Sequence, residues 1–269
     1  MLLRPLGNTD LTVPVIGMGT WRTFDVRGAE EEETRAWIID AALESGSNLV
    51  DTSPMYGEAE RVLAAALEDR RDRAIIATKV WTESLVEGRR QIERALEWYG
   101  GYVDIYQIHN LVAWRKHLPV LEALRDEGRI GIIGATHYRH EAFPELRTVM
   151  ETGRIQQIQI PYNARDHAAA REILPLAAEL GLGVLVMRPL GGGALVGNPP
   201  PAVRLDPLRK FGITTWAQAL LKWIISDQRV HSAIPATSKV ERVRENAAAG
   251  DGPLLDPDAR SYIASLAAA

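Results

Sequence analysis

Residues 102–137, YVDIYQIHNLVAWRKHLPVLEALRDEGRIGIIGATH, contain the repeating unit from which most of the chain is built. Two apolar runs, 104–109 and 130–136, enclose a segment long enough for a helix. The second run has no alternation of polar and apolar side chains, which is typical of a strand buried on both faces. Two strands joined by a helix in this way form a parallel pair with the helix packed on the sheet.

The same unit recurs on both sides of this stretch. Further short apolar runs occupy residues 15–19, 48–51, 74–79, 157–160, 183–187 and 232–235. Successive strand ends from Asp51 to Val186 lie 23 to 30 residues apart, as one strand–helix unit requires. Eight such units predict a protein of the α/β class, a closed parallel (β/α)8 TIM barrel that forms a single domain over residues 1–269. A doubly wound sheet is the alternative, but no G-x-G-x-x-G sequence follows the first strand.

Four local signals complete the predicted architecture. The N-terminal segment predicts a hairpin that turns at Gly7-Asn8 and caps the barrel floor. Thr215 with Gln218, and Ser238 with Glu241, each predict a capping box at the start of a helix. The Gly- and Pro-rich stretch 190–207 is too long for an ordinary connection, which favours a functional loop.

The composition excludes several classes of function. The chain has no Cys, which rules out disulfides and Cys-ligated metal centres. Its net charge of -4 argues against a nucleic-acid partner or an anionic membrane surface. No apolar run approaches the ~18 residues of a membrane helix, and the first residues lack the apolar centre of a signal peptide. We therefore expect a soluble cytoplasmic protein.

Four chemically useful side chains follow predicted strands. Asp51, Lys79 and His109 each end a strand, and Tyr56 lies in the loop DTSPMYG after Asp51. Because the C-terminal ends of the strands form the active-site face of a (β/α)8 barrel, we expect the four side chains to converge there. Each one alone is also compatible with a structural role, such as a cap, a rim lysine or a packed ring.

Together the four residues favour proton transfer. Lys79 and Asp51 are expected to form a buried ion pair, whose ammonium eases the ionisation of the Tyr56 phenol. A tyrosine otherwise titrates at about pH 10 and is a poor acid at neutral pH. His109 is expected to hydrogen-bond to a substrate oxygen at the same place.

These residues and their surroundings resemble the catalytic tetrad and flanking motifs of the aldo-keto reductases. The similar segments, in chain order, are LLRPLGNTDLTVPVIGMGTW, LVDTSPMYGEAERVLAAAL, KVW, YVDIYQIHN, GRIGIIGATH, IQQIQIPYN and IPATSKVERVREN. The resemblance implies an oxidoreductase that reduces aldehydes or ketones to alcohols with a hydride from NADPH, with NADH as the alternative cofactor. It implies that Tyr56 is the general acid and that Lys79 and Asp51 tune it. His109 would orient the carbonyl group.

The resemblance also implies where the cofactor binds. Thr20 and Trp21 would border the nicotinamide, Gln159 would reach its carboxamide, and Arg242 would meet the 2′-phosphate of NADPH. The full implied set is Thr20, Trp21, Asp51, Thr136, His137, Gln159, Met187, Arg188, Pro189, Leu190, Gly191, Gly192, Gly193, Ala236, Ser238, Arg242, Glu245 and Asn246.

The chain departs from the family pattern at three of these places. Thr136-His137 replaces the Ser-Asn pair of many relatives, and Met187 replaces an aromatic residue that stacks on the nicotinamide. Ala236 stands where many NADPH-preferring relatives have Lys. NADPH is therefore favoured over NADH mainly on the strength of Arg242.

Three tryptophans, Trp21, Trp81 and Trp114, are expected in loops at the barrel mouth, where they would suit aromatic and small aldehydes. The long C-terminal loop that covers the pocket in many relatives is not expected, which predicts an open pocket. Two other functions stay open. One is a non-catalytic nicotinamide-binding sensor module. The other is a metal-dependent hydrolase with ligands drawn from Asp51, His109, His137 and His140, against which the charge of Lys79 argues; no metal is expected.

Overall fold

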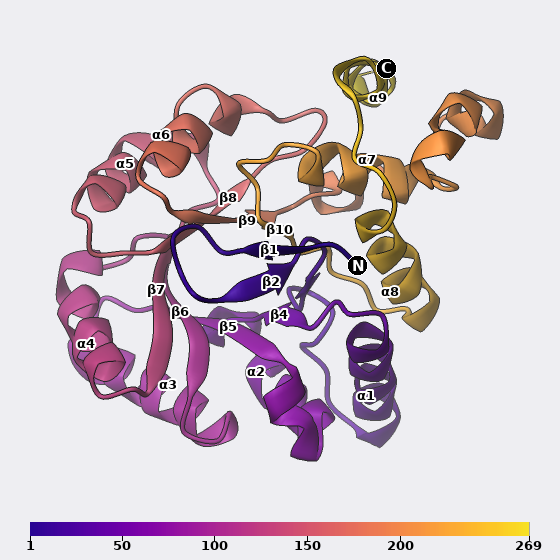
Figure 1. Ribbon diagram of the computed structural model, residues 1–269. Coiled ribbons are helices and arrows are strands. Elements are labelled where there is room, and N and C mark those ends of the chain that lie inside the picture. Colours follow the sequence, from indigo (N-terminus) through magenta and orange to yellow (C-terminus); the bar gives the residue numbers. More distant parts are fainter. Residues whose placement is uncertain (269) are drawn as a thin grey trace.

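Eight parallel strands in the described part of the chain, residues 1–268, surround a common axis and form the predicted barrel (Figure 1). The structure is a computed structural model, and Ala269, the last residue of the predicted domain, lies outside the described residues. The strands are β3 (Met18–Gly19), β4 (Leu49–Asp51), β5 (Ile75–Val80), β6 (Val103–His109), β7 (Ile130–Thr136), β8 (Gln157–Pro161), β9 (Gly183–Met187) and β10 (Ser232–Ala233). They pair in this order. Parallel bridges from Ile16 to Ala233 and from Gly19 to Ala236 join the first strand to the last, so the sheet closes.

A helix follows each strand of the barrel and covers its outer face (Figure 1). The helices are α1 (Ala29–Glu44), α2 (Ala59–Leu67), α3 (Leu85–Trp98), α4 (Trp114–Asp126), α5 (Phe143–Glu151), α6 (Ile173–Glu179), α7 (Trp216–Ile225), α8 (Val240–Ala247) and the additional α9 (Pro257–Ala268). The capping box predicted before α7 is present: the Thr215 hydroxyl accepts from the Gln218 N–H, and the Gln218 side chain accepts from the Thr215 N–H.

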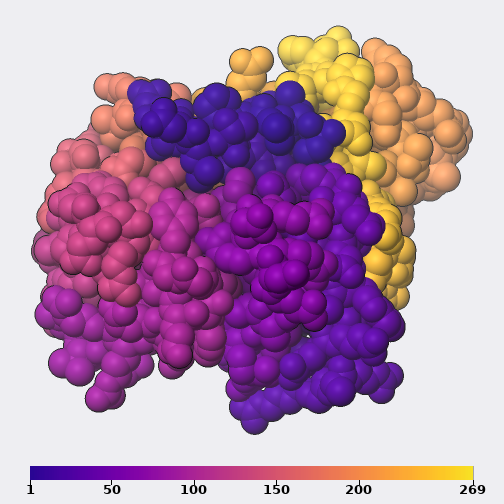
Figure 2. All heavy atoms as spheres, turned by 60° about the horizontal axis from the view of Figure 1, so that its bottom comes forward, coloured from indigo at the N-terminus to yellow at the C-terminus, as the bar shows by residue number. Residues whose placement is uncertain are grey.

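The predicted N-terminal hairpin closes one end of the barrel. Its strands β1 (Leu3–Pro5) and β2 (Thr12–Pro14) are antiparallel and cross the barrel axis at the centre of Figure 1. Leu6 and Val13 are fully buried against apolar side chains of the barrel interior, which confirms the floor cap. Gly7 has a φ of 59°, and a Cβ there would collide with the backbone of Gly183. In Figure 2 the indigo N-terminal segment lies beside the yellow C-terminal segment, and the Leu2 N–H donates to the Gly250 carbonyl at 2.9 Å.

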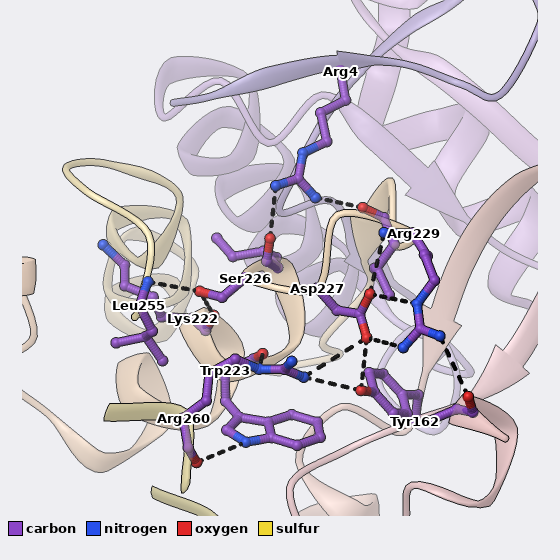
Figure 3. Close-up of polar contacts among 12 residues, drawn as sticks. Arg4, Tyr162, Lys222, Trp223, Ser226, Asp227, Arg229, Leu255 and Arg260 are labelled. Atoms are coloured by element: carbon purple, nitrogen blue, oxygen red, sulfur yellow. Dashed lines mark hydrogen bonds and ion pairs between the residues drawn. The ribbon is translucent and has the colours of Figure 1, made fainter. Parts of the chain in front are cut away.

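A polar network around Asp227 fastens the end of β8 to the C-terminal helices (Figure 3). Asp227 is buried at the end of α7 and accepts hydrogen bonds from Tyr162 at 3.0 Å and from Arg229 at 2.7 Å. Arg260 of α9 donates to the Tyr162 hydroxyl at 3.0 Å. Because Tyr162 directly follows β8, the network fixes the start of a loop on the active-site face.

The capping box predicted for Ser238 and Glu241 is wrong. The Thr237 hydroxyl accepts from the Lys239 N–H at 3.1 Å and forms a turn just before α8. Helix α8 therefore begins at Val240, one residue later than the predicted box requires, and its N-cap residue Lys239 makes no side-chain cap. The predicted loop 190–207 contains short 3-10 turns at Gly191–Gly193 and from Ala202 onward. Among the helices of residues 1–268, none combines the length and the apolar character needed to cross a membrane.

Candidate active site

The centre of the site is a buried ion pair between the ends of two adjacent strands. Lys79 of β5 is fully buried, and its Nζ donates to both carboxylate oxygens of Asp51 at 2.8 Å and to the Thr52 carbonyl at 2.6 Å. A buried charge is stable only when it is paired and fully hydrogen-bonded, and here all three ammonium N–H groups have acceptors. Burial alone would lower the pKa of Lys79, but Asp51 and Tyr56 raise that pKa above its usual value, so the side chain stays an ammonium.

Two glutamines complete the surroundings of the carboxylate. Gln107 Nε2 donates to Asp51 Oδ1 at 3.1 Å, and Gln159 Nε2 donates to Asp51 Oδ2 at 3.3 Å. Gln159 is one of the residues predicted for the site, whereas Gln107 is not. The signal for Gln107 was present in the sequence, because it lies two residues before His109 and therefore on the same face of β6.

Tyr56 lies beside this pair. It ends a 3-10 turn, Pro54–Tyr56, whose N-cap Ser53 accepts a hydrogen bond from the Met55 N–H. Lys79 Nζ is 5.1 Å from the centre of the Tyr56 ring. Burial raises the pKa of the Tyr56 phenol, and the Lys79 and Arg188 cations oppose this rise without reversing it. The predicted effect of Lys79 is present, since its charge acts to lower the Tyr56 pKa, but the loss of water outweighs it and the net pKa is raised.

His109 meets Tyr56 edge to face. The two ring centres are 5.8 Å apart at an interplanar angle of 88°. His109 is 5% exposed, and burial together with the Lys79 charge lowers its pKa to about 2, so the imidazole is neutral. Its Nδ1 is 2.8 Å from the Ser53 hydroxyl, a partner that the sequence analysis missed. The Ser-Pro step in DTSPMYG is a helix-start signal and does not by itself point to His109.

Several buried polar atoms at the strand ends have no hydrogen-bond partner among residues 1–268. They include the Thr136 hydroxyl and the carbonyl oxygens Oε1 of Gln107 and Gln159, whose side-chain nitrogens donate to Asp51. Thr136 and Gln159 are register partners on β7 and β8, so their side chains leave the sheet at one level. Buried polar groups are rarely left without a partner, and such a pair suits a ligand that both donates and accepts. The neighbouring Thr20 hydroxyl donates to the Asp51 carbonyl at 3.0 Å.

His137 is turned toward its own loop. Its Nδ1 accepts from the Arg139 N–H at 3.0 Å, and its ring stacks on Tyr138 with centres 5.5 Å apart. Burial lowers the pKa of His137. Only its Nε2 is left to make the contact that the family's Asn would make.

The remaining predicted cofactor residues form two stretches, one from the end of β9 into the loop that follows it and one from the loop after β10 into α8. Arg188 and Gly191 line a cavity of about 220 Å³ together with Asn163 and Leu195. Met187 packs on the interior core, Pro189 is buried, and Leu190, Gly192 and Gly193 continue the loop. After β10, Ala236, Ser238 and Arg242 are exposed, the Glu245 carbonyl accepts from Gln218, and Asn246 is buried.

The three predicted pocket tryptophans differ in their surroundings. Trp21 is half-buried with the Arg22 guanidinium 4.2 Å from its ring centre. Trp81 is 41% exposed, and its ring centre is 6.5 Å from that of His109. Trp114 does not lie in a loop as expected. It begins α4, is buried in the outer core, and donates its indole N–H to Glu145, because its apolar ring and its one donor are both satisfied there.

The sequence as a whole matches one family. The model of the aldo/keto reductase family matches residues 15–268.

The chain belongs to the aldo/keto reductase family.

The predicted family, enzyme class and barrel fold are thereby confirmed. This aldo-keto reductase is 28% identical to an NADH-specific methylglyoxal reductase of Escherichia coli, over 95% of each protein. It is 27% identical to a second methylglyoxal reductase of Escherichia coli, over 89% of this chain and 86% of the relative. An aldo/keto reductase from Klebsiella pneumoniae, solved in complex with NADP and acetate, matches with a TM-score of 0.80 and 26% identity, over 95% of this chain and 92% of that one.

The hydrolase alternative gains no support from the geometry of this aldo-keto reductase. Within residues 1–268, no group of three or more His, Cys, Asp or Glu side chains is arranged to hold a metal ion. Asp51, which that alternative needs as a ligand, faces the Lys79 ammonium instead.

Proposed function

We propose that this aldo-keto reductase reduces small aldehydes and ketones to alcohols, with Tyr56 as the general acid and NADPH as the preferred cofactor. The observation that carries the proposal is the buried Asp51–Lys79 pair beside Tyr56 at the C-terminal ends of the strands. Bound NADPH supplies the hydride that the carbonyl carbon receives. The residues of the chain supply the proton and hold the substrate oxygen.

Tyr56 is suited to donate that proton. Its raised pKa keeps the phenol protonated at neutral pH until a stronger base is present. The carbonyl oxygen becomes such a base as negative charge develops on it, and the Tyr56 O–H then donates to it. The phenolate left on Tyr56 is stabilised by the adjacent Lys79 ammonium, which Asp51 holds in place before the reaction begins.

His109 orients the substrate oxygen in this scheme. The Ser53 hydroxyl oxygen accepts from the Met55 N–H, so its own hydrogen is available for His109 Nδ1. This arrangement favours the tautomer of the neutral ring with its proton on Nε2. Nε2 is then a donor toward the carbonyl oxygen that Tyr56 protonates.

The partnerless atoms at the strand ends support a nicotinamide site. A carboxamide has one acceptor and two donors, which fit the Thr136 hydroxyl and Gln159 Oε1. In this proposal, Thr20, Trp21 and the loop from Met187 to Gly193 hold the rest of the nicotinamide and the pyrophosphate. The segment from Ala236 to Asn246, with Ser238 and Glu245, would hold the adenosine end.

Arg242 is the proposed reader of the 2′-phosphate. Its side chain is exposed near the start of α8 and forms no ion pair with a carboxylate of residues 1–268. The complex of the Klebsiella pneumoniae neighbour with NADP supports the preference for NADPH. The NADH-specific relative from Escherichia coli supports NADH as the alternative.

Small carbonyl compounds are the proposed substrates. The two methylglyoxal reductases among the relatives support short 2-oxoaldehydes, and the exposed Trp81 near His109 supports aromatic aldehydes. We also propose that residues 1–269 act as one domain and that the enzyme works in the cytoplasm. The cysteine-free composition supports a reducing compartment.

The test is a fluorescence titration with NADPH and NADH, followed by addition of methylglyoxal or 4-nitrobenzaldehyde. Tryptophan quenching that saturates, followed by oxidation of the cofactor, supports the reductase.

Tyr56→Phe should lower the turnover number by about 10²–10⁴-fold while cofactor binding persists. Tyr102→Phe is the matched control, because Tyr102 is exposed and directly precedes β6, at the opposite end of that strand from His109. Cofactor binding without oxidation by any simple aldehyde would favour the sensor alternative. Near-normal turnover in Tyr56→Phe would overturn the assignment of the acid.

A further inference from the structure

A row of cations and aromatic rings crosses the mouth of the barrel. The Arg188 guanidinium, after β9, lies 5.7 Å from the ring centre of Trp21, after β3, and 4.9 Å from that of Tyr138, after β7. Arg22 lies over the same Trp21 ring at 4.2 Å, and Arg139 lies over the same Tyr138 ring at 5.1 Å. Arg188 therefore joins three loops that come from different parts of the barrel rim.

The backbone holds Arg188 in an uncommon conformation at this place. Its φ is 51°, in the left-handed region that residues other than glycine rarely occupy. Its carbonyl accepts from the Gly191 N–H at 3.0 Å and from the Asn163 side chain at 3.2 Å. A fixed, strained backbone at a site face is a reason to look for a function of the side chain it carries.

The guanidinium of Arg188 carries a charge that the chain does not neutralise. Its side chain is exposed, and no carboxylate within residues 1–268 forms an ion pair with it. Its field reaches the active site, because the Arg188 cation acts to lower the pKa of Tyr56. Arg188 is therefore a member of the row whose charge acts on the reacting group.

We propose that Arg188 binds a carboxylate carried by the substrate, so that the enzyme prefers aldehydes and ketones that are also anions. The inference rests on the proposed function, since it adds a substrate contact to the same site. A guanidinium presents paired N–H groups that match the two oxygens of a carboxylate. The aromatic rings of Trp21 and Tyr138 hold the side chain near the mouth, which reduces the entropy lost when the anion binds.

The experiment compares benzaldehyde with 3- and 4-carboxybenzaldehyde in the wild-type enzyme and in Arg188→Gln. The measured quantity is the ratio of kcat/KM for a carboxylated aldehyde to kcat/KM for benzaldehyde. Benzaldehyde serves as the internal reference, because a loss in cofactor binding lowers both constants together. We expect Arg188→Gln to lower this ratio by about 10-fold or more for at least one isomer. Arg188→Lys, which keeps the charge and loses the paired donors, should lower it less.

Arg139→Gln is the matched control, because it removes a neighbouring exposed cation that lies over the same Tyr138 ring. Its ratio should stay within about 2-fold of the wild-type value. An Arg188→Gln ratio that also stays within 2-fold would overturn the inference. If the Kd for NADPH rises in that case, Arg188 contacts the cofactor instead. If the wild-type enzyme binds NADPH but reduces neither kind of aldehyde, the proposed function itself fails and the inference falls with it.

Discussion

Replacing Asp51 with Asn should destabilise the protein far more than the loss of one hydrogen bond. The carboxylate supplies two of the three acceptors of Lys79 Nζ, both at 2.8 Å, and Lys79 has no exposed surface. An amide has one oxygen, which accepts, and one NH₂ group, which donates. In the variant, the NH₂ group would therefore point at the Lys79 ammonium and at a glutamine Nε2, which are both donors. Removing one partner of a buried ion pair typically costs about 3–5 kcal/mol. For a chain of this length that corresponds to a fall in Tm of roughly 5–9 °C.

The assay is urea unfolding of the wild type and Asp51→Asn at pH 7.5, with the slope of the transition checked for constancy. The control is Asp206→Asn, which breaks the exposed Arg209–Asp206 pair, whose side chains are 69% and 54% exposed. That change should alter the free energy of unfolding by about 0.5 kcal/mol or less. The double variant Asp51→Asn with Lys79→Met should recover much of the loss, because it leaves no unpaired charge in the interior.

The Asp51–Lys79 pair also predicts how the difference in the free energy of unfolding between the wild type and Asp51→Asn depends on pH. In the wild type the pKa of Lys79 is raised, so the pair stabilises fully below about pH 10 and less above it. Without Asp51, burial would lower the Lys79 pKa, and the penalty would shrink as pH rises above that lowered pKa toward about 10, the value of an unfolded lysine. The difference between the two proteins should therefore narrow between pH 7.5 and 10. If Asp51→Asn lowers the free energy of unfolding by less than about 1 kcal/mol at pH 7.5, as expected for an exposed pair, the reasoning is refuted.

Two other residues give independent predictions. Arg242→Ala should weaken NADPH binding about 10-fold more than NADH binding in fluorescence titrations, and an equal loss for both would exclude a contact with the 2′-phosphate. Glu60 is 3% exposed, accepts from the Thr78 hydroxyl at 2.5 Å, and has its pKa raised by burial to about 7. Its protonated form stabilises the fold below about pH 4, and this contribution is lost as pH rises through 7. Urea unfolding should show the wild type losing about 3 kcal/mol relative to Glu60→Gln between pH 4.5 and 7.5, and parallel pH profiles would contradict this.

The barrel was predictable because its signal is repeated along the chain. Each strand–helix unit is a local pattern of apolar residues, and the regular distance between strand ends fixes the topology without knowledge of any contact. The convergence of Asp51, Lys79 and His109 follows from the same regularity, since each lies within one residue of the end of a strand and all strands end on one face.

Apart from the capping box at Ser238, the errors and omissions concern contacts between residues far apart in the chain. The contacts of Asp51 with Gln107 and of His109 with Ser53 join residues that are each 56 positions apart in the chain. The net shift of the Tyr56 pKa depends on how much water the folded loop removes, which one sequence does not state. The position of Trp114 was also missed because it depends on a distant contact: its partner Glu145 lies on the next helix around the barrel.

The closing contacts of the barrel have a consequence for biosynthesis. They pair Ile16 with Ala233 and Gly19 with Ala236, so β3 stays without a neighbour on one side until the last quarter of the chain exists. At about 5–20 residues per second, a ribosome needs roughly 10–45 s to go from one partner to the other. Strands β4 and β5, which bear the Asp51–Lys79 pair, emerge early in that interval. The nascent chain thus passes through a stage with an open sheet edge, and a translational pause before β10 would prolong its exposure to aggregation.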